Sequence, residues 1–161
     1  MKSLIIPLFF LCSCYSKKAI PPQSEFYGKI VKIVDGDTYD LLVGNTTMRI
    51  RMDGIDAPER GMPFYKVSKE YLGNLCNGQT LKIITIKIDR YKRFLANTYL
   101  ENGCSVSVLM VKAGYAWHFK KYSNNGELSN AEVEAKLKRL GLWIDENPIP
   151  PWVWRANMKN K

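Results

Sequence analysis

The chain has 161 residues, a formal net charge of +9, and 46% hydrophobic and 12% aromatic residues. This length and apolar content suffice for one ordinary hydrophobic core, so the composition predicts a single domain. The excess of basic residues favours a polyanionic partner, either nucleic acid or an anionic membrane surface, although basic charge alone is common. The only histidine, His118, excludes mechanisms that need two histidines.

The first residues have the pattern of an export signal. Lys2 supplies a positive charge, and the apolar run that follows, residues 4–11, is too short to span a bilayer. The run ends in Leu-Cys-Ser-Cys, which resembles the lipobox of bacterial lipoproteins. We therefore expect residues 1–13 to be a lipoprotein signal peptide and Cys14 to carry the lipid; an ordinary secretory signal cut nearby is the alternative. The mature protein would be exported and membrane-anchored, at the outer membrane and periplasm or at the cell surface.

The segment after the lipid site is predicted to be a tether. Residues 14–25 are polar, contain two prolines and show no periodicity, so they would hold the domain a short distance from the membrane. Export also affects the remaining cysteines, because an oxidising compartment permits a disulfide between Cys76 and Cys104. Two unpaired thiols are the alternative.

From residue 26 onward the periodicity predicts five strands and three helices. The strands are expected at residues 29–34, 38–43, 46–52, 80–88 and 94–100, and the fourth is so apolar that both its faces could be buried. The helices are expected at residues 63–75 and 105–113, with a third that starts at a capping box in 129–132 and ends at Gly141. This set indicates an α+β fold: a five-stranded OB-fold β-barrel with about three α-helices.

Two clusters of carboxylates interrupt this otherwise basic chain. Asp35 and Asp37 follow the first predicted strand, and Asp56 and Glu59 lie just beyond the third. With one histidine and no Cys-x-x-Cys spacing, the chain disfavours a zinc site. Oxygen ligands suit calcium or magnesium, so the clusters predict a divalent-cation site.

Arginines near these acids match the requirements of phosphodiester hydrolysis. That reaction needs a carboxylate to deprotonate a water, a hard cation, and an arginine that binds two phosphate oxygens. Arg51 precedes the second acid cluster, and Arg93 lies in a basic loop that would meet a nucleotide. Each arginine alone fits a solvated surface charge, but together with the acids they indicate a phosphodiesterase. His118 is interpreted as a packing or surface residue, since no Gly-x-Ser-x-Gly nucleophile elbow occurs.

Three motifs in a fixed order resemble the staphylococcal nuclease (thermonuclease) family. They are Asp-Gly-Asp-Thr at residues 35–38, Arg-x4-Asp-x-Pro-Glu at 51–59 and Asp-x3-Arg at 89–93. Shorter matches follow at 114–117 and 141–143. The resemblance spans residues 26–155 and leaves 156–161 as a basic C-terminal tail. Any one motif alone would be weak evidence, whereas the ordered set is specific.

The resemblance implies an OB-fold endonuclease that uses Ca2+ to cut DNA and RNA and leaves 3′-phosphates. The carboxylates of Asp37 and Asp56 and the backbone carbonyl of Ala57 would bind the cation. Glu59 would orient or deprotonate the attacking water, and Asp35 would lie beside the site as an outer acid.

The resemblance also assigns the groups that meet the substrate. Arg51 and Arg93 would hold the phosphate and its transition-state charge. Tyr91 and Tyr122 fall where the family places aromatic residues near the bound nucleotide, and Arg90 belongs to the same basic loop as Tyr91.

Some positions depart from the family pattern. Lys92 stands where the family usually has glycine, and it would be strained if its φ is positive. Asp53 is a further acid to which we assign no role. In the Pro-Trp-x-x-Arg-like ending, Trp152 and Trp154 are expected to pack the C-terminus onto the barrel, with base stacking as the alternative.

The sequence thus predicts a Ca2+-dependent endonuclease, exported and lipid-anchored, that acts on DNA and/or RNA as a monomer. The alternative is a lipid-anchored nucleic-acid-binding OB module with little or no catalysis.

Overall fold

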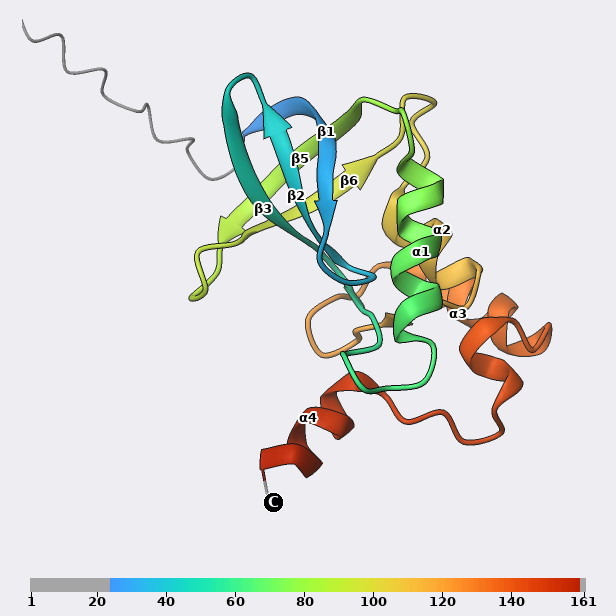
Figure 1. Cartoon of the computed structure of the whole chain (residues 1–161). Helices are drawn as coiled ribbons and strands as arrows, with labels where there is room; N and C mark the ends of the chain where they lie inside the picture. Colours follow the sequence, from blue (N-terminus) through green and yellow to red (C-terminus); the bar gives the residue numbers. More distant parts are fainter. Residues whose placement is uncertain (1–23, 160–161) are drawn as a thin grey trace, which may run out of the picture.

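The computed structural model describes residues 24–159 (Figure 1). The predicted signal peptide, the lipid site at Cys14 and nearly all of the tether lie outside these residues. Among the helices of residues 24–159, none is both long and apolar enough to cross a membrane.

Five strands close into a barrel. Their order around it is β1-β2-β3-β6-β5. β3 and β6 run parallel, and every other neighbouring pair is antiparallel. The strands are β1 (Glu25–Ile33), β2 (Thr38–Val43), β3 (Thr46–Met52), β5 (Leu81–Ile88) and β6 (Phe94–Tyr99). The predicted α+β fold with a five-stranded barrel is confirmed.

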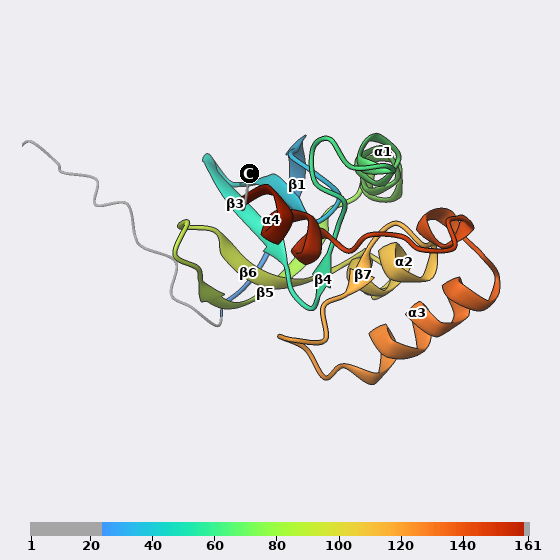
Figure 2. The same ribbon diagram turned by 90° about the horizontal axis from the view of Figure 1, so that it is seen from below.

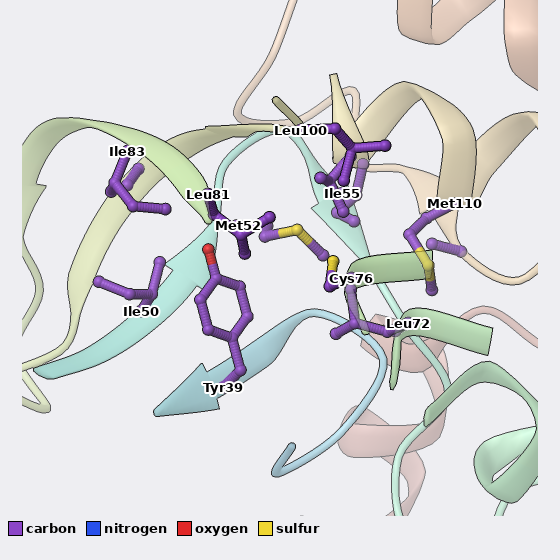
Figure 3. Close-up of a cluster of buried hydrophobic side chains, with 14 of the residues drawn as sticks. Tyr39, Ile50, Met52, Ile55, Leu72, Cys76, Leu81, Ile83, Leu100 and Met110 are labelled. Carbon is purple, nitrogen blue, oxygen red and sulfur yellow. The ribbon is translucent and has the colours of Figure 1, made fainter. Parts of the chain in front are cut away.

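The barrel interior is filled by one apolar cluster that extends to helix α1 (Tyr65–Cys76). Tyr39, Ile50 and Ile83 are fully buried inside the barrel, and Leu72 and Cys76 join them from α1 (Figure 3). The prediction that both faces of the fourth strand are buried was wrong. Alternate residues of β5 are buried, from Leu81 to Thr85, and the residues between them are partly exposed, because the outer face of the barrel wall meets solvent.

Residues 24–159 contain four α-helices, not the three predicted. Besides α1 they are α2 (Val106–Lys112), α3 (Gly126–Leu137) and α4 (Pro151–Lys159), with a short 3-10 helix, η1, at Gly141–Ile144. α1 and α2 lie at one end of the barrel, and α3 packs against α2 (Figures 1 and 2). A second, two-stranded sheet pairs β4 (Ile55–Asp56) with β7 (Trp117–His118).

The predicted start and end of the third helix were wrong. α3 begins at Gly126, and the side chain of Asn125 caps it by accepting hydrogen bonds from the amides of Glu127 and Leu128. The predicted capping box lies inside the helix, because Asn125 caps the helix four residues earlier; its serine and glutamate side chains contact His118. The helix ends at Leu137, before Gly141, and the chain then turns at Arg139, whose φ is 53°.

Helix α4 was not predicted. Its first residue is Pro151, which suits the first turn because a proline there lacks only an amide that would have no helical partner. Residues 156–159, which the sequence assigned to a basic tail, continue this helix. The ring of Trp152 stacks on Phe119 with centroids 5.1 Å apart and planes 3° apart. The prediction that Trp152 and Trp154 pack the C-terminus onto the barrel is corrected in the surface they meet: both rings are partly buried against Met62, Trp117 and Leu142, which lie outside the barrel strands.

The structure contains no disulfide between Cys76 and Cys104. Cys76 is a free thiol buried in the core at the end of α1, whereas Cys104 is a free thiol exposed in a turn. The expected bridge is therefore corrected to two unpaired cysteines, because one side chain packs inward and the other meets solvent.

Candidate active site

The two acid clusters meet at one end of the barrel. The Ala57 amide donates a 2.7 Å hydrogen bond to Oδ2 of Asp37, and the Met52 amide donates a 2.8 Å hydrogen bond to the Asp37 carbonyl. The pairing of β2 with β3 places Thr38 opposite Arg51. Asp37 is therefore anchored to both segments that carry the remaining acids.

A tight turn brings Asp56 to this place. Gly54, with a φ of 74°, reverses the chain between β3 and β4, and a side chain there would collide with Leu128. β4 then pairs Asp56 with Trp117 of β7. The Asp56 side chain is only 2% exposed, so its charge must be balanced within the protein.

Arg51 lies between the two buried carboxylates. Its Nη2 is 3.0 Å from Asp56 Oδ1 and 3.2 Å from Asp37 Oδ2, and its Nη1 donates a 2.9 Å hydrogen bond to the Met52 carbonyl. The guanidinium is thus fixed at the bottom of the site, among the predicted cation ligands.

A second arginine reaches the same carboxylates from α4. Arg155 donates to Asp56 Oδ2 at 2.7 Å and to Asp56 Oδ1 at 3.2 Å, and it also donates to Oε1 of Glu59. Arg155 was not among the predicted site residues. The available signal was its place three positions after Trp152, which puts both side chains on one face of a helix.

Asp35 lies beside Asp37, as the resemblance implied. Its Oδ1 accepts a 3.2 Å hydrogen bond from the Asp37 amide. Burial, together with the nearby Asp37 carboxylate, raises the pKa of Asp35 to about 7. Burial also raises the pKa of Asp56, and Asp37 adds to this rise while Arg155 and Arg51 oppose it. The site therefore holds more carboxylate than its arginines fully offset.

The loop between β5 and β6 presents the second predicted arginine. Asp89 accepts hydrogen bonds from the amides of Tyr91 and Arg93, and the Arg93 guanidinium lies 2.7 Å from Asp89 Oδ2. Burial alone would raise the pKa of Asp89, but its hydrogen bonds with Arg93 hold it below the ordinary value. Arg93 thus faces the cleft paired with its own loop, not in contact with the buried acids.

Tyr91 is an exposed ring between two arginines of this loop. Its centroid lies 4.8 Å from the guanidinium carbon of Arg90 and 5.3 Å from that of Arg93. Lys92, which stands where the family usually has glycine, has a φ of 61°. This positive φ is strained for a residue with a side chain, as expected from the sequence. The loop offers an aromatic face surrounded by cationic groups, which suits a nucleotide.

One cleft of about 1320 Å³ joins all of these groups. Every predicted catalytic, cation-binding and substrate-binding residue lines it, as does Arg155. The predicted residues are Asp35, Asp37, Arg51, Asp56, Ala57, Glu59, Arg90, Tyr91, Arg93 and Tyr122. The arrangement places a carboxylate pair, arginines and exposed aromatic rings along one continuous surface.

His118 is a buried packing residue, as predicted. Its side chain contacts the hydroxyl of Ser129 at 3.1 Å, and its amide donates to Glu132 at 3.1 Å. Burial lowers the pKa of His118, which favours the neutral imidazole. Glu132 is in turn paired with Lys120 and Lys136.

Asp53, the acid without an assigned role, belongs to the turn and not to the cleft. Its amide donates to the Ala96 carbonyl at 2.9 Å, its carbonyl accepts from the Ser107 hydroxyl at 3.3 Å, and its carboxylate bonds to the Gly54 amide. These contacts hold the turn that delivers Asp56.

The donor set fits a hard cation. Asp37, Asp56 and the Ala57 carbonyl offer oxygen atoms alone. Burial raises the pKa of both Asp35 and Asp56, and the neighbouring Asp37 carboxylate adds to each rise. Within residues 24–159 the structure contains no cluster of three or more histidine, cysteine or acidic side chains arranged around a common metal position. The fit therefore rests on two carboxylates and a backbone oxygen.

Comparison with known proteins agrees with this site. The model of the staphylococcal nuclease homologue family matches residues 49–145, more than half of the chain. The chain is 35% identical to an uncharacterized endonuclease of Escherichia coli O157:H7 over 132 residues, 82% of this chain and 86% of that protein.

Two further relatives extend the comparison. A micrococcal nuclease of Shigella flexneri is 35% identical over 152 residues, covering 88% of this chain and 87% of its own. A staphylococcal-like nuclease of Arabidopsis thaliana is 42% identical over 111 residues, 69% of this chain and 34% of that longer protein. Because the family model matches more than half of the chain and these relatives align over most of it, the chain belongs to the staphylococcal nuclease family.

Proposed function

We propose that this protein is an exported, lipid-anchored endonuclease that hydrolyses phosphodiester bonds of DNA and/or RNA with Ca2+ and leaves 3′-phosphates. The observation that carries the proposal is the position of Arg51, 3.0 Å from Asp56 and 3.2 Å from Asp37, in the cleft that Glu59 also lines. Family membership supports nuclease chemistry at this place.

The cation would be held by Asp37, Asp56 and the carbonyl of Ala57. When bound, Ca2+ supplies positive charge against the charge that develops on the phosphate. Asp37 is kept in place by the Ala57 amide and by the Thr38 hydroxyl, which donates to its Oδ1 at 2.9 Å. The ligand oxygens are therefore preorganised by the barrel.

Glu59 is the candidate for water activation. Its side chain is 42% exposed, so a water in the cleft can reach it, unlike the buried carboxylate of Asp56. A carboxylate that accepts a proton from water needs this access. Glu59 would orient the water or remove its proton.

Arginines and aromatic rings would hold the substrate. Arg51 can stabilise negative charge at the bottom of the cleft, and Arg93 can approach the phosphate from the loop after β5. Tyr91 and Tyr122 are 64% and 66% exposed and line the cleft, which makes both rings accessible to a nucleotide. Arg90 adds a further cation beside Tyr91.

The first test is cleavage of plasmid DNA by purified mature protein. We expect nicking with Ca2+, none in EGTA, and loss of most activity in Arg51→Ala and Arg93→Ala. The products should carry 5′-hydroxyls that a polynucleotide kinase labels without prior phosphatase treatment. DNA that is bound but stays intact in Ca2+ would establish the binding-module alternative.

The membrane anchor is tested separately. The basis for the anchor is the Leu-Cys-Ser-Cys sequence that ends at Cys14. Cys14→Ser should release the protein from the membrane fraction of the expressing cell, and an unchanged membrane fraction would refute lipidation at this residue.

A further inference from the structure

Arg155 occupies carboxylate oxygens that a cation would need. Asp56 Oδ1 accepts from both Arg51 and Arg155, and Asp56 Oδ2 accepts from Arg155. The same guanidinium holds Glu59. A carboxylate has about four acceptor positions, so three of those on Asp56 are already used by arginine hydrogen bonds.

Of the two arginines on Asp56, Arg155 is the one that can leave. Arg51 belongs to a barrel strand, is 12% exposed and is also tied to the Met52 carbonyl. Arg155 is 38% exposed and extends from α4, the last helix of the described chain. Figure 1 shows α4 below the barrel, beyond the end of its strands.

The Arg155 side chain can leave while α4 stays in place. The helix is anchored independently of Arg155, because Trp152 stacks on Phe119 and both Trp152 and Trp154 pack partly buried against the cluster of Met62, Trp117 and Leu142. The Arg155 side chain is 38% exposed and can rotate toward solvent about its own torsions. Release of the guanidinium therefore requires no rearrangement of the barrel.

We propose that Arg155 is an internal counter-cation of the site: it occupies the Asp56 oxygens that a divalent cation would need while it also holds Glu59, and cation binding displaces it. The inference rests on the proposed role of Asp37 and Asp56 as cation ligands. Both positive groups seek the same oxygens and repel each other at short range, so their binding is mutually exclusive there. Cation affinity is then reduced by the free energy needed to break the contacts of Arg155.

The test is calcium binding to the full chain, purified in detergent and measured by isothermal titration calorimetry in the absence of nucleic acid. Arg155→Gln removes the competing charge, and we expect it to bind Ca2+ about tenfold more tightly than wild type, since a charge-assisted hydrogen-bond pair is worth about 1.4 kcal/mol or more. Arg139→Gln is the matched control. The Arg139 side chain is exposed, donates to the Ile144 carbonyl and does not line the cleft, so the control should bind Ca2+ as wild type does.

A second measurement covers the cation-free state. In EGTA, Arg155→Gln should melt at a lower temperature than wild type because Asp56 and Glu59 lose their shared partner, and Ca2+ should raise its melting temperature by more than it raises that of wild type. If Arg155→Gln does not fold, Arg155→Lys takes its place. An ammonium cannot engage both Asp56 oxygens and Glu59 as a guanidinium does, so Ca2+ affinity should still rise several-fold.

The outcomes separate the inference from the proposed function. Wild type that binds Ca2+ and nicks DNA, with unchanged or weaker Ca2+ binding in Arg155→Gln, would overturn the role of Arg155 and leave the nuclease proposal intact. Absence of Ca2+ binding in wild type and variants alike would overturn both. An equal increase in the Ca2+ affinity of Arg139→Gln would also overturn the inference, because the increase would then come from the lower net charge of the variants and not from the loss of Arg155.

Discussion

The backbone amide of Ala57 donates a 2.7 Å hydrogen bond to the carboxylate of Asp37, which lies 20 positions earlier in the chain. This contact joins the two acidic stretches into one site. Because the contact is made by a backbone amide, substitution of the Ala57 side chain would not remove the donor, and the backbone that follows β4 sets the spacing between the acids.

Arg51 is predicted to be required for cleavage. Arg51→Ala should lower the rate of plasmid nicking by about 10²–10³-fold, since it removes a preorganised cation from the site where negative charge develops. Arg51→Lys should recover only part of this loss, because an ammonium cannot bond two oxygens in a plane.

Arg49→Ala is the matched control for this prediction. Arg49 lies on the same strand but pairs with Asp40 at the surface and does not line the cleft. Nicking rates are measured with circular dichroism spectra of each variant. Activity of folded Arg51→Ala equal to that of Arg49→Ala would contradict the assigned role.

The buried histidine predicts a pH dependence of stability. Burial lowers the pKa of His118 from its ordinary 6.5, with a further decrease from Lys120 and an opposing effect from Glu132. As pH falls through about 6.5 the unfolded chain binds a proton at this residue, while the folded protein does so only at lower pH. Neutral His118 therefore stabilises the fold at pH values above its unfolded pKa. This stabilisation is lost as the pH falls through the lower pKa of His118 in the folded protein.

His118→Gln removes this titration. The free energy of unfolding, measured by urea denaturation in EGTA between pH 7.5 and about 5, should fall less steeply in the variant than in wild type. Identical pH slopes for the two proteins would show that His118 does not carry the effect.

The two cysteines should differ in thiol reactivity. Burial raises the pKa of Cys76 to about 12, so it should resist Ellman's reagent at pH 8 until the protein is unfolded, whereas exposed Cys104 should react at once. Cys104→Ser should remove one fast-reacting thiol and Cys76→Ser only a slow one. A disulfide would give the opposite result, with each substitution releasing one new free thiol.

Lys92 should be replaceable by glycine with a gain in stability. Its φ of 61° is a left-handed conformation that costs a non-glycine residue about 1 kcal/mol, part of which the greater freedom of unfolded glycine offsets. Lys92→Gly should therefore raise the free energy of unfolding by up to about 1 kcal/mol in urea titrations.

Lys121→Gly is the control, because Lys121 lies in an exposed turn and its φ is not positive. The control should be slightly less stable than wild type. A loss of stability in Lys92→Gly similar to that of Lys121→Gly would indicate that position 92 is not strained.

Much of the fold could be read from local patterns. The strands at Thr38–Val43 and Thr46–Met52 were predicted to the residue, because alternation and the turn at Gly44 are properties of a few neighbouring positions. The predicted start of α3 was wrong because Ser129 and Glu132 have the spacing of a capping box but do not cap the helix. Their side chains contact His118 instead, a residue in another element of the fold.

By itself, the sequence determined the strands expected to form the barrel and the acid and arginine motifs that resemble the family, since each depends on residue types at short spacing. Only the tertiary structure decided which groups meet: Arg51 between Asp37 and Asp56, Arg93 paired with Asp89, and Arg155 on Asp56 from 99 positions away. The physical reason is that ion pairing depends on distance in space, and a buried carboxylate accepts whichever guanidinium the fold brings within reach.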